Sequence, residues 1–334
     1  MRTVPIHFVQ RLLRVADRRG LDLKPLLRKA GIPADIAEQP MARVTIEQAA
    51  VLTRGLYRIT GDEMFGLGPP LPLGTVEFMA LAIIHAPDLR TILTRMAHAT
   101  TTVVPGAPGL CVEFGDRVTV LRVDVSQLDD PEHLGVDVLI AFVHRFIGWL
   151  IGRRIPLLSL EFPYTEPPYA TDYDRIYGRA PTFDPNAGDV VTLSLDSALL
   201  DAPIVRDEDD LLDFMRHQPI AWLGTRDYGS STADRVRKVL ERGLRGDWPT
   251  PEEIAARLTV SAQHLRRLLR AEHTSITAIR AEILRDEAIA SLARGDEPVD
   301  ALAVRLGFSE ASALRRAFRR WTGSPLSAYR TREK

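Results

Sequence analysis

The sequence predicts an α+β N-terminal domain followed by an all-α domain with two helix-turn-helix motifs joined by a linker helix. Three observations lead to this fold class. Helical and strand-like hydrophobic patterns mix up to about residue 205, without the regular alternation of a parallel α/β fold. A stretch rich in Pro, Gly and Ser follows at about residue 220. Beyond it the chain has helical periodicity and contains one motif twice.

Length and composition fit a protein of two or three packed domains, because the chain has 334 residues and is 45% apolar. The longest apolar runs are shorter than the roughly 20 residues that cross a bilayer, and no signal-peptide pattern is present. Cys111 is the one cysteine, which excludes an internal disulfide and a cysteine metal cluster. We therefore expect a cytoplasmic protein without a membrane partner.

Charge is distributed unevenly along the chain. Residues 231–334 contain 20 Lys and Arg against 14 Asp and Glu, a net charge of +6, whereas the remainder of the chain carries −7. A basic domain favours polyanionic partners such as nucleic acid. The alternative is an ordinary solvated surface, which net charge alone does not exclude.

Two early segments of the N-terminal domain have helical periodicity. Residues 5–20 predict a helix that ends at Gly20. Residues 45–60 predict a second helix, with Thr45 as its N-cap and Gln48 completing a capping box.

The rest of this domain predicts a mixture of helices and strands. Residues 110–125 predict a β-hairpin that turns at Gly115 and Asp116, because β-branched residues alternate along its second arm. Similar patterns predict helices at 88–100, 133–152 and 206–217, and strands at 157–164 and 189–195. We place the domain boundaries so that residues 1–217 form the N-terminal domain, 218–231 the linker and 232–334 the C-terminal domain.

The C-terminal domain contains an internal repeat. "IAARLTVSAQHLRRLLR" begins at Ile254, and "LAVRLGFSEASALRRAFR" begins at Leu302. The shared elements match at an offset of 48, and at 49 after one inserted residue. Two copies indicate paired modules rather than a solenoid.

Each copy reads as a helix, a tight turn and a second helix. In the first copy, Thr250 and Glu253 form a capping box around Pro251, and Ser261 caps the second helix. In the second copy, Pro298 opens the first helix, Gly307 supplies the turn, and Ser309 is expected to cap the second helix. This order of elements is typical of a helix-turn-helix.

The second helix of each copy is amphipathic when it is drawn with about 100° per residue. The apolar stripes consist of Leu265, Leu268 and Leu269 in the first copy and of Ala311, Leu314, Phe318 and Trp321 in the second. The opposite faces carry Gln263, Arg266, Arg267 and Arg270 in the first copy and Ser312, Arg315, Arg316 and Arg319 in the second.

These outward faces suit the chemistry of double-stranded DNA. An α-helix fits the major groove, where Arg can donate two hydrogen bonds to guanine and Gln can read adenine. Other arginines contact phosphates, and we expect this of Arg270, Arg319 and Arg320. An amphipathic helix with a solvated charged face is the alternative for a single copy, but the repeat and the capping residues favour DNA. The helix between the modules ends at Gly295 and would hold them for successive major grooves, about 10 bp apart.

The C-terminal domain resembles the AraC/XylS family of bacterial transcription regulators. The resemblance covers residues 232–330 and depends most on "AVRLGFS" from Ala303, on "GSP" from Gly323 and on "YR" from Tyr329. It implies that Gln263, Arg266 and Arg267 read bases in the first module, and that Ala311, Ser312, Arg315 and Arg316 do so in the second. Ala311 and Thr274 depart from the family pattern, since Ala311 offers only an apolar contact and Thr274 stands where Gly is common.

Residues 5–205 resemble the branch of this family that has a large N-terminal sensor domain. The matching segments are "LPLGTVEFMALAIIHAPDLRTIL", "YDRIYGRAPTFDP" and "DSALLDAPI". The resemblance implies a domain that senses a small-molecule effector and forms a homodimer, with RNA polymerase as a further partner. It does not identify arabinose as the ligand, and the effector-binding residues are unknown.

Other functions remain as alternatives at this stage. A sequence-tolerant architectural DNA-binding protein and a DNA-tethered enzyme would also carry a basic domain. No nucleophile elbow, Walker loop or metal-binding histidine spacing is present, so we expect no catalytic residues, metal or cofactor. Phe142, Phe146 and Trp149 could line an effector pocket, although aromatic residues at helical spacing are more often core.

Overall fold

The computed structural model describes residues 3–216, 231–242, 248–272, 274–295 and 297–330. Its contacts divide the chain into two compact units. The helical unit comprises Met1–Leu13, Gly20–Leu52 and Gly229–Lys334, and the sheet unit comprises Arg14–Arg19 and Thr53–Tyr228. The predicted linker 218–231 falls almost wholly outside the described residues, so the functional boundaries 1–217, 218–231 and 232–334 remain a prediction.

The sheet unit is built on a five-stranded sheet with the order β3-β4-β7-β5-β6. The strands are β3 (Gly109–Phe114), β4 (Val118–Asp124), β5 (Leu157–Phe162), β6 (Thr182–Phe183) and β7 (Val190–Asp196). All neighbouring strands are antiparallel except β5 and β6. The hairpin of β3 and β4 turns at Gly115 and Asp116 as predicted, and this confirms an α+β domain rather than a parallel α/β fold.

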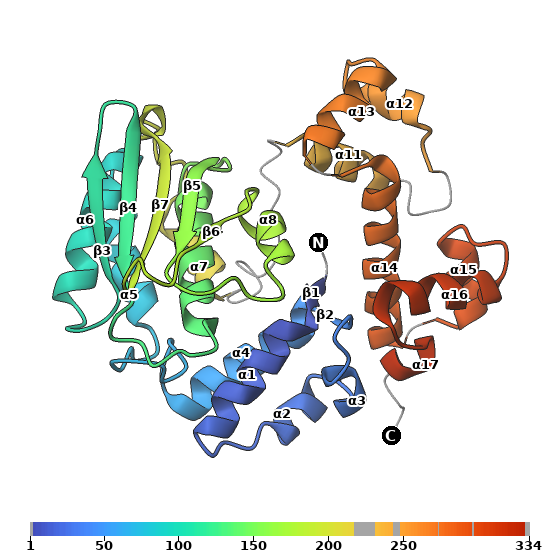
Figure 1. Ribbon diagram of the computed structural model, residues 1–334, viewed down its shortest axis with the longest axis horizontal. Helices are drawn as coiled ribbons and strands as arrows, with labels where there is room; N and C mark the ends of the chain where they lie inside the picture. The colour runs from blue at the N-terminus through green and yellow to red at the C-terminus, as the bar shows by residue number, and fades with distance from the viewer. Residues whose placement is uncertain (1–2, 217–230, 243–247, 273, 296, 331–334) are drawn as a thin grey trace. The chain divides into compact units, whose positions relative to one another are not determined.

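Helices cover one face of this sheet because its strands alternate apolar and polar residues. Leu121, Leu193 and Leu160 are buried in the core, together with most of helix α7. Figure 1 shows α6 and α7 against that face of the sheet. The helical segments of this part of the chain are α5 (Thr75–Ile83), α6 (Leu89–Thr102), α7 (Leu134–Leu150), α8 (Thr171–Tyr177), the 3₁₀ helix η1 (Ser197–Leu199) and α9 (Glu208–Arg216).

The aromatic residues of α7 are core residues. Phe146 and Trp149 are each 2% exposed, and their rings lie 5.9 and 4.5 Å from that of Phe214 on α9. Phe142 packs against the same core. The alternative in which these side chains line an effector pocket is therefore not supported.

A buried polar cluster lies at the other side of α7. The carboxylate of Asp137 accepts hydrogen bonds of 2.7 Å from the hydroxyls of Tyr164 and Tyr173. The imidazole of His144 contacts the carbonyl oxygen of Ile155 through Nε2 at 2.8 Å. These bonds satisfy polar groups that would otherwise cost free energy in the core.

The helical unit contains the C-terminal helices α11 (Thr232–Glu241), α12 (Pro251–Arg257), α13 (Ala262–Ala271), α14 (Ile276–Arg294), α15 (Val299–Arg305), α16 (Ala311–Thr322) and α17 (Leu326–Tyr329). In Figure 1, α14 runs between α11–α13 at one end and α15–α17 at the other. This arrangement confirms the two helix-turn-helix motifs and the linker helix, which ends at Gly295 in the left-handed conformation as predicted.

The N-terminal residues of the helical unit form a small subdomain. Its elements are β1 (Thr3–Pro5), α1 (Ile6–Arg18), α2 (Lys24–Lys29), α3 (Ala34–Ala37), β2 (Arg43–Thr45) and α4 (Ile46–Thr60), of which α1 and α4 extend beyond it. β1 and β2 pair in antiparallel register, Thr3 opposite Thr45. The predicted capping box of α4 is present, since the backbone N–H of Gln48 donates to Thr45 Oγ1 at 3.1 Å and that of Thr45 to Gln48 Oε1 at 2.9 Å.

Buried hydrogen bonds join these two strands to the C-terminal helices. The hydroxyl of Thr3 donates to Asp286 Oδ1 on α14 at 2.7 Å, and Arg43 Nε donates to the same hydroxyl at 2.8 Å. The backbone N–H of Arg43 donates to the Tyr329 hydroxyl on α17 at 3.2 Å. Because Thr3, Arg43, Asp286 and Tyr329 are all buried, the N-terminal strands are part of the packing of the linker helix.

His144 gives the sheet unit a defined dependence on pH. Burial lowers the pKa of His144 to about 4, an effect that the hydrogen bond to Ile155 only partly offsets. The unfolded chain takes up this proton near the ordinary pKa of about 6.5, so acid favours the unfolded state between about pH 6.5 and 4. From pH 7 to 5 we expect the free energy of unfolding to fall by about 2 kcal/mol on account of His144.

Urea unfolding of wild type and His144→Gln at pH 7 and pH 5 measures this contribution. Glutamine retains a donor for the Ile155 carbonyl but does not titrate, so the variant should show the smaller loss at pH 5. An equal loss in both proteins would contradict the assignment.

Candidate nucleic-acid interface

The first module holds α13 in place through conventional caps. Thr250 Oγ1 accepts from the backbone N–H of Glu253 at 3.2 Å, and Glu253 Oε2 accepts from that of Thr250 at 2.7 Å, which confirms the capping box. Ser261 caps α13 as predicted, accepting from the N–H of His264 at 3.1 Å. Both helices of the first module therefore begin with a side-chain cap.

The turn between α12 and α13 depends on an unusual residue. Thr259 has φ of +58°, in the left-handed region that β-branched residues rarely adopt. Gly307 occupies the matching place in the second module with φ of +80°. Both copies of the repeat therefore have a left-handed residue at this turn, but only the second copy has glycine there. The threonine of the first copy holds local backbone strain.

The predicted side chains of α13 share one exposed face. Leu265 and Leu269 are buried in the core of the module. Gln263, Arg266, Arg267 and Arg270 are all exposed. Arg267 donates from Nη2 to His264 Nδ1 at 3.0 Å, so the imidazole orients this guanidinium at the outer surface.

The second module begins its outer helix one residue later than the sequence predicted. The N-cap of α16 is Glu310 and not Ser309. Glu310 has extended backbone angles, and its carbonyl oxygen accepts from the N–H of Ala313 at 3.1 Å. The side chain of Glu310 makes no capping bond; its carboxylate accepts from the hydroxyl of Ser312 and lies near the positive end of the helix dipole.

The exposed face of α16 matches that of α13. Leu314 and Phe318 are buried, and the Phe318 ring meets Tyr329 edge-on at 5.1 Å. The exposed side chains are those of Arg315, Arg316, Arg319 and Arg320, whereas Ala311 and Ser312 are half-buried at the start of the helix. Arg316 lies 3.7 Å from the Glu310 carboxylate, so the second face includes one acid.

Ion pairs fix α15 to the linker helix. Arg305 Nη1 lies 3.0 Å from the buried Glu287 carboxylate of α14, and its Nε donates to Glu297 at 3.1 Å. Hydrogen bonds to Glu297, followed by those to Glu287, raise the pKa of Arg305. Since this arginine stays charged at any relevant pH, its ion pairs with Glu287 and Glu297 are not lost through its deprotonation.

Trp248 contacts both modules, and sequence reasoning missed it. Its side chain packs against the core of the first module. The guanidinium of Arg280, on α14, lies 4.5 Å from the centre of the ring. A methyl group added to Gly307 would stand 3.4 Å from Trp248 Nε1, which places the indole against the turn of the second module. Trp248 lies before the first copy of the repeat, so no comparison of the copies could have identified it.

Comparison with known families places both parts of the chain. Residues 20–204 match the family described as "Arabinose-binding domain of AraC transcription regulator, N-term", which is more than half of the chain. Residues 254–332 match the family described as "Helix-turn-helix domain" and include both outer helices.

Two relatives are similar over nearly their whole length. The "Ornithine utilization regulator" of Pseudomonas aeruginosa is 24% identical over 330 residues, covering 98% of this chain and 96% of the relative. An "Uncharacterized HTH-type transcriptional regulator" of Mycobacterium tuberculosis is 24% identical over 356 aligned positions, with the same coverage of 98% and 96%.

Two solved structures are also similar. The transcriptional regulator CdpR from Pseudomonas aeruginosa is 18% identical over 97% of each chain, with a TM-score of 0.33. A DNA-binding transcriptional dual regulator from Escherichia coli K-12 is 25% identical over 30% of this chain and 89% of its own, with a TM-score of 0.29. Both scores are too low to establish a shared overall arrangement. Among the described residues, no helix is both long enough and apolar enough to span a membrane.

Trp248→Ala should weaken binding to a complete operator more than binding to random duplex. The substitution removes a side chain that contacts both modules, so the two outer helices lose part of their fixed spacing. We expect about a tenfold loss of affinity for an operator selected from a random duplex library, equivalent to about 1.4 kcal/mol. Trp248→Phe, which retains an aromatic ring over Arg280, is the matched control. An equal loss on random duplex would show that Trp248 affects stability and not spacing.

Proposed function

The chain belongs to the AraC family of helix-turn-helix transcription regulators, and we propose that it reads its operator with the outward faces of α13 and α16. It is a DNA-binding regulator with an N-terminal ligand-binding domain. The observation that carries the proposal is the pair of exposed arginine-rich faces, each on a helix whose other side is buried.

The proposed roles divide between bases and phosphates. We assign base contacts to Gln263, Arg266, Arg267, Ala311, Ser312, Arg315 and Arg316, and phosphate contacts to Arg270, Arg319 and Arg320. Guanidinium groups form two hydrogen bonds with guanine in the major groove, and the glutamine amide does so with adenine. Ala311 can contact a thymine methyl group. Phosphate contacts supply affinity and register without reading sequence.

Control by a small molecule completes the proposed function. An effector that binds one arrangement of the protein better than another shifts the population toward it, and so changes how the modules meet DNA. One relative is named for ornithine utilization, and we propose by analogy that this chain controls genes for the use of a small nutrient. The regulator would act in the cytoplasm as a homodimer and activate transcription by contacting RNA polymerase.

The other candidate functions have less support. The relatives are named as regulators and not as enzymes, and the chain is not an enzyme. A sequence-tolerant architectural protein would bind all duplexes with similar affinity, whereas a regulator prefers its site by about 10³-fold or more. Titration of specific and random duplex at one salt concentration separates these two functions.

Arg267→Ala and Arg316→Ala test the proposed reading faces. If each guanidinium contacts a base, each substitution should weaken operator binding by about 1–3 kcal/mol and relax the preference at one position. Fluorescence anisotropy with the operator and single-base variants measures both effects.

Arg58→Ala is the control, because Arg58 is an exposed arginine of the sheet unit. Unchanged affinity and unchanged sequence preference in both reading-face variants would contradict the assignment.

A further inference from the structure

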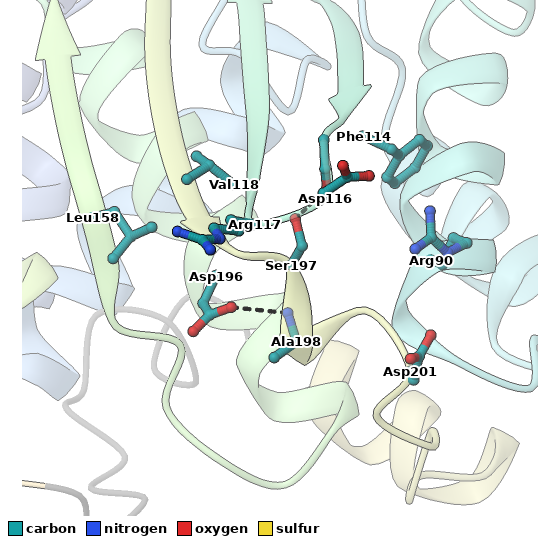
Figure 2. A pocket seen from close by; sticks show the side chains of 11 residues that line it. Arg90, Phe114, Asp116, Arg117, Val118, Leu158, Asp196, Ser197, Ala198 and Asp201 are labelled. Atoms are coloured by element: carbon teal, nitrogen blue, oxygen red, sulfur yellow. Dashed lines mark hydrogen bonds between the residues drawn. The ribbon is translucent and has the colours of Figure 1, made fainter.

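A hollow of about 770 Å³ opens at one end of the sheet in the sheet unit. The β3–β4 turn, the end of β7, η1 and the start of α6 border this open hollow, and Leu158 of β5 contributes one side. The volume is within the range of about 300–1,000 Å³ that small-molecule sites occupy. In Figure 2, Arg90 and Phe114 lie on one side of Ser197, and Arg117, Val118 and Leu158 lie on the other.

Hydrogen bonds to Ser197 make the floor of this hollow rigid. The Ser197 hydroxyl donates to the Gly115 carbonyl oxygen at 2.7 Å and lies 2.9 Å from the Thr119 hydroxyl. The backbone N–H of Ser197 donates to the carbonyl oxygen of Arg117 at 3.0 Å. Because these bonds join the β3–β4 turn to η1, the backbone segments that carry the lining side chains are fixed beside one another before any ligand binds.

Apolar side chains remain exposed around this space. Phe114, Val118 and Leu158 are 39%, 41% and 43% exposed, although large apolar residues normally move into the core. The three come from different strands or strand ends and meet at the same hollow. They provide the apolar contact area that a ligand of a few carbon atoms requires.

Charged groups of both signs line the same space. The guanidinium of Arg90 lies 5.0 Å from the centre of the Phe114 ring, and Asp196 caps η1 by accepting from the N–H of Ala198 at 2.9 Å. Within the described part of the chain, no ion pair engages Asp116, Arg117 or Asp201. With three aspartates and two arginines, the lining carries a net charge of −1.

We propose that this hollow binds a free amino acid that has a cationic side chain, as the effector of the regulator. The ligand carboxylate would pair with Arg117, its two ammonium groups with Asp116 and Asp201, and its methylene groups would lie against Phe114 and Leu158. A ligand of charge +1 complements a lining of charge −1, and the opposed groups exclude simple anions and apolar molecules. The inference rests on the proposed control by a small molecule and adds its chemical class and its site.

Calorimetric titration of the full-length protein tests the ligand class. L-lysine should bind, L-leucine should bind at least tenfold more weakly because it lacks the second ammonium group, and cadaverine at least tenfold more weakly because it lacks the carboxylate. Failure of L-lysine, L-arginine and L-ornithine to bind at millimolar concentration would overturn the proposal. So would equal binding of L-lysine and cadaverine.

Variants test the site. Arg117→Ala and Asp201→Asn should each weaken L-lysine binding at least tenfold, and Arg117→Lys should restore part of the loss in the first. Arg95→Ala, which removes an exposed arginine of α6 outside the hollow, is the matched control. Thermal unfolding of each variant shows whether the fold is retained. Wild-type affinity in both Arg117→Ala and Asp201→Asn overturns the site.

Operator binding separates this inference from the proposed function. Selective operator binding that another class of small molecule modulates, with no binding of cationic amino acids, would overturn the hollow as the effector site and leave the regulator intact. Loss of selective operator binding in the wild type would instead overturn the proposed function, whatever the hollow binds.

Discussion

The arginines of α13 and α16 can remain in solvent because the opposite side of each helix is fixed in a hydrophobic core. Helices of 10 and 12 residues are marginal in water on their own, so tertiary packing must hold them. Leu265 and Leu269 serve the first module in this way, and Leu314 and Phe318 serve the second. Burying these four side chains orients the charged faces, since rotating either helix would expose leucine or phenylalanine and bury a guanidinium. Each of those changes costs several kcal/mol.

The linker helix α14 also constrains how the two modules are placed relative to each other. Both modules pack on α14. Its buried carboxylates, those of Asp286 and Glu287, bind side chains of the segments that pack against it. Glu287 pairs with Arg305 of the second module, while Asp286 accepts from Thr3 of the N-terminal strands. Arginines of α14 itself share these acids, since Arg285 Nη2 lies 3.1 Å from Asp286 Oδ1 and Arg294 Nη2 lies 3.9 Å from the Glu287 carboxylate. Each neighbour therefore adds a partner to a buried acid, which needs several to offset its desolvation. Residues from both ends of the sequence therefore pack on the helix that joins the two modules.

Sequence reasoning succeeded where the determining contacts are local. The capping box at Thr250 and the turn at Gly307 follow from residues within a few positions of one another, and both are confirmed. Ser309 was a wrong prediction, because the backbone extends through Glu310 and the helix starts later. The contacts of Trp248 with Gly307 and of Thr3 with Asp286 join distant parts of the chain, and no periodicity encodes them. The hollow at Ser197 could not be predicted from the sequence for the same reason, since its lining residues come from separate strands and helices.

The two modules differ in one respect that bears on how they meet DNA. In the second, Arg316 is paired at 3.7 Å with Glu310, and both side chains are largely exposed. Such a pair contributes about 0–1 kcal/mol, whereas a bidentate contact with guanine is worth about 1–3 kcal/mol. With Arg316 in its proposed role, a guanine would displace the carboxylate and a wrong base would not, and the freed Glu310 would then stand beside DNA as an uncompensated negative charge. The first module has no acid at the matching N-cap position, where Ser261 stands, so its proposed reading face lacks this negative charge. Under the proposed base contact, the pair with Glu310 must be broken before Arg316 meets its base, so a correct base there should add less affinity than the corresponding contact of Arg267 in the first module.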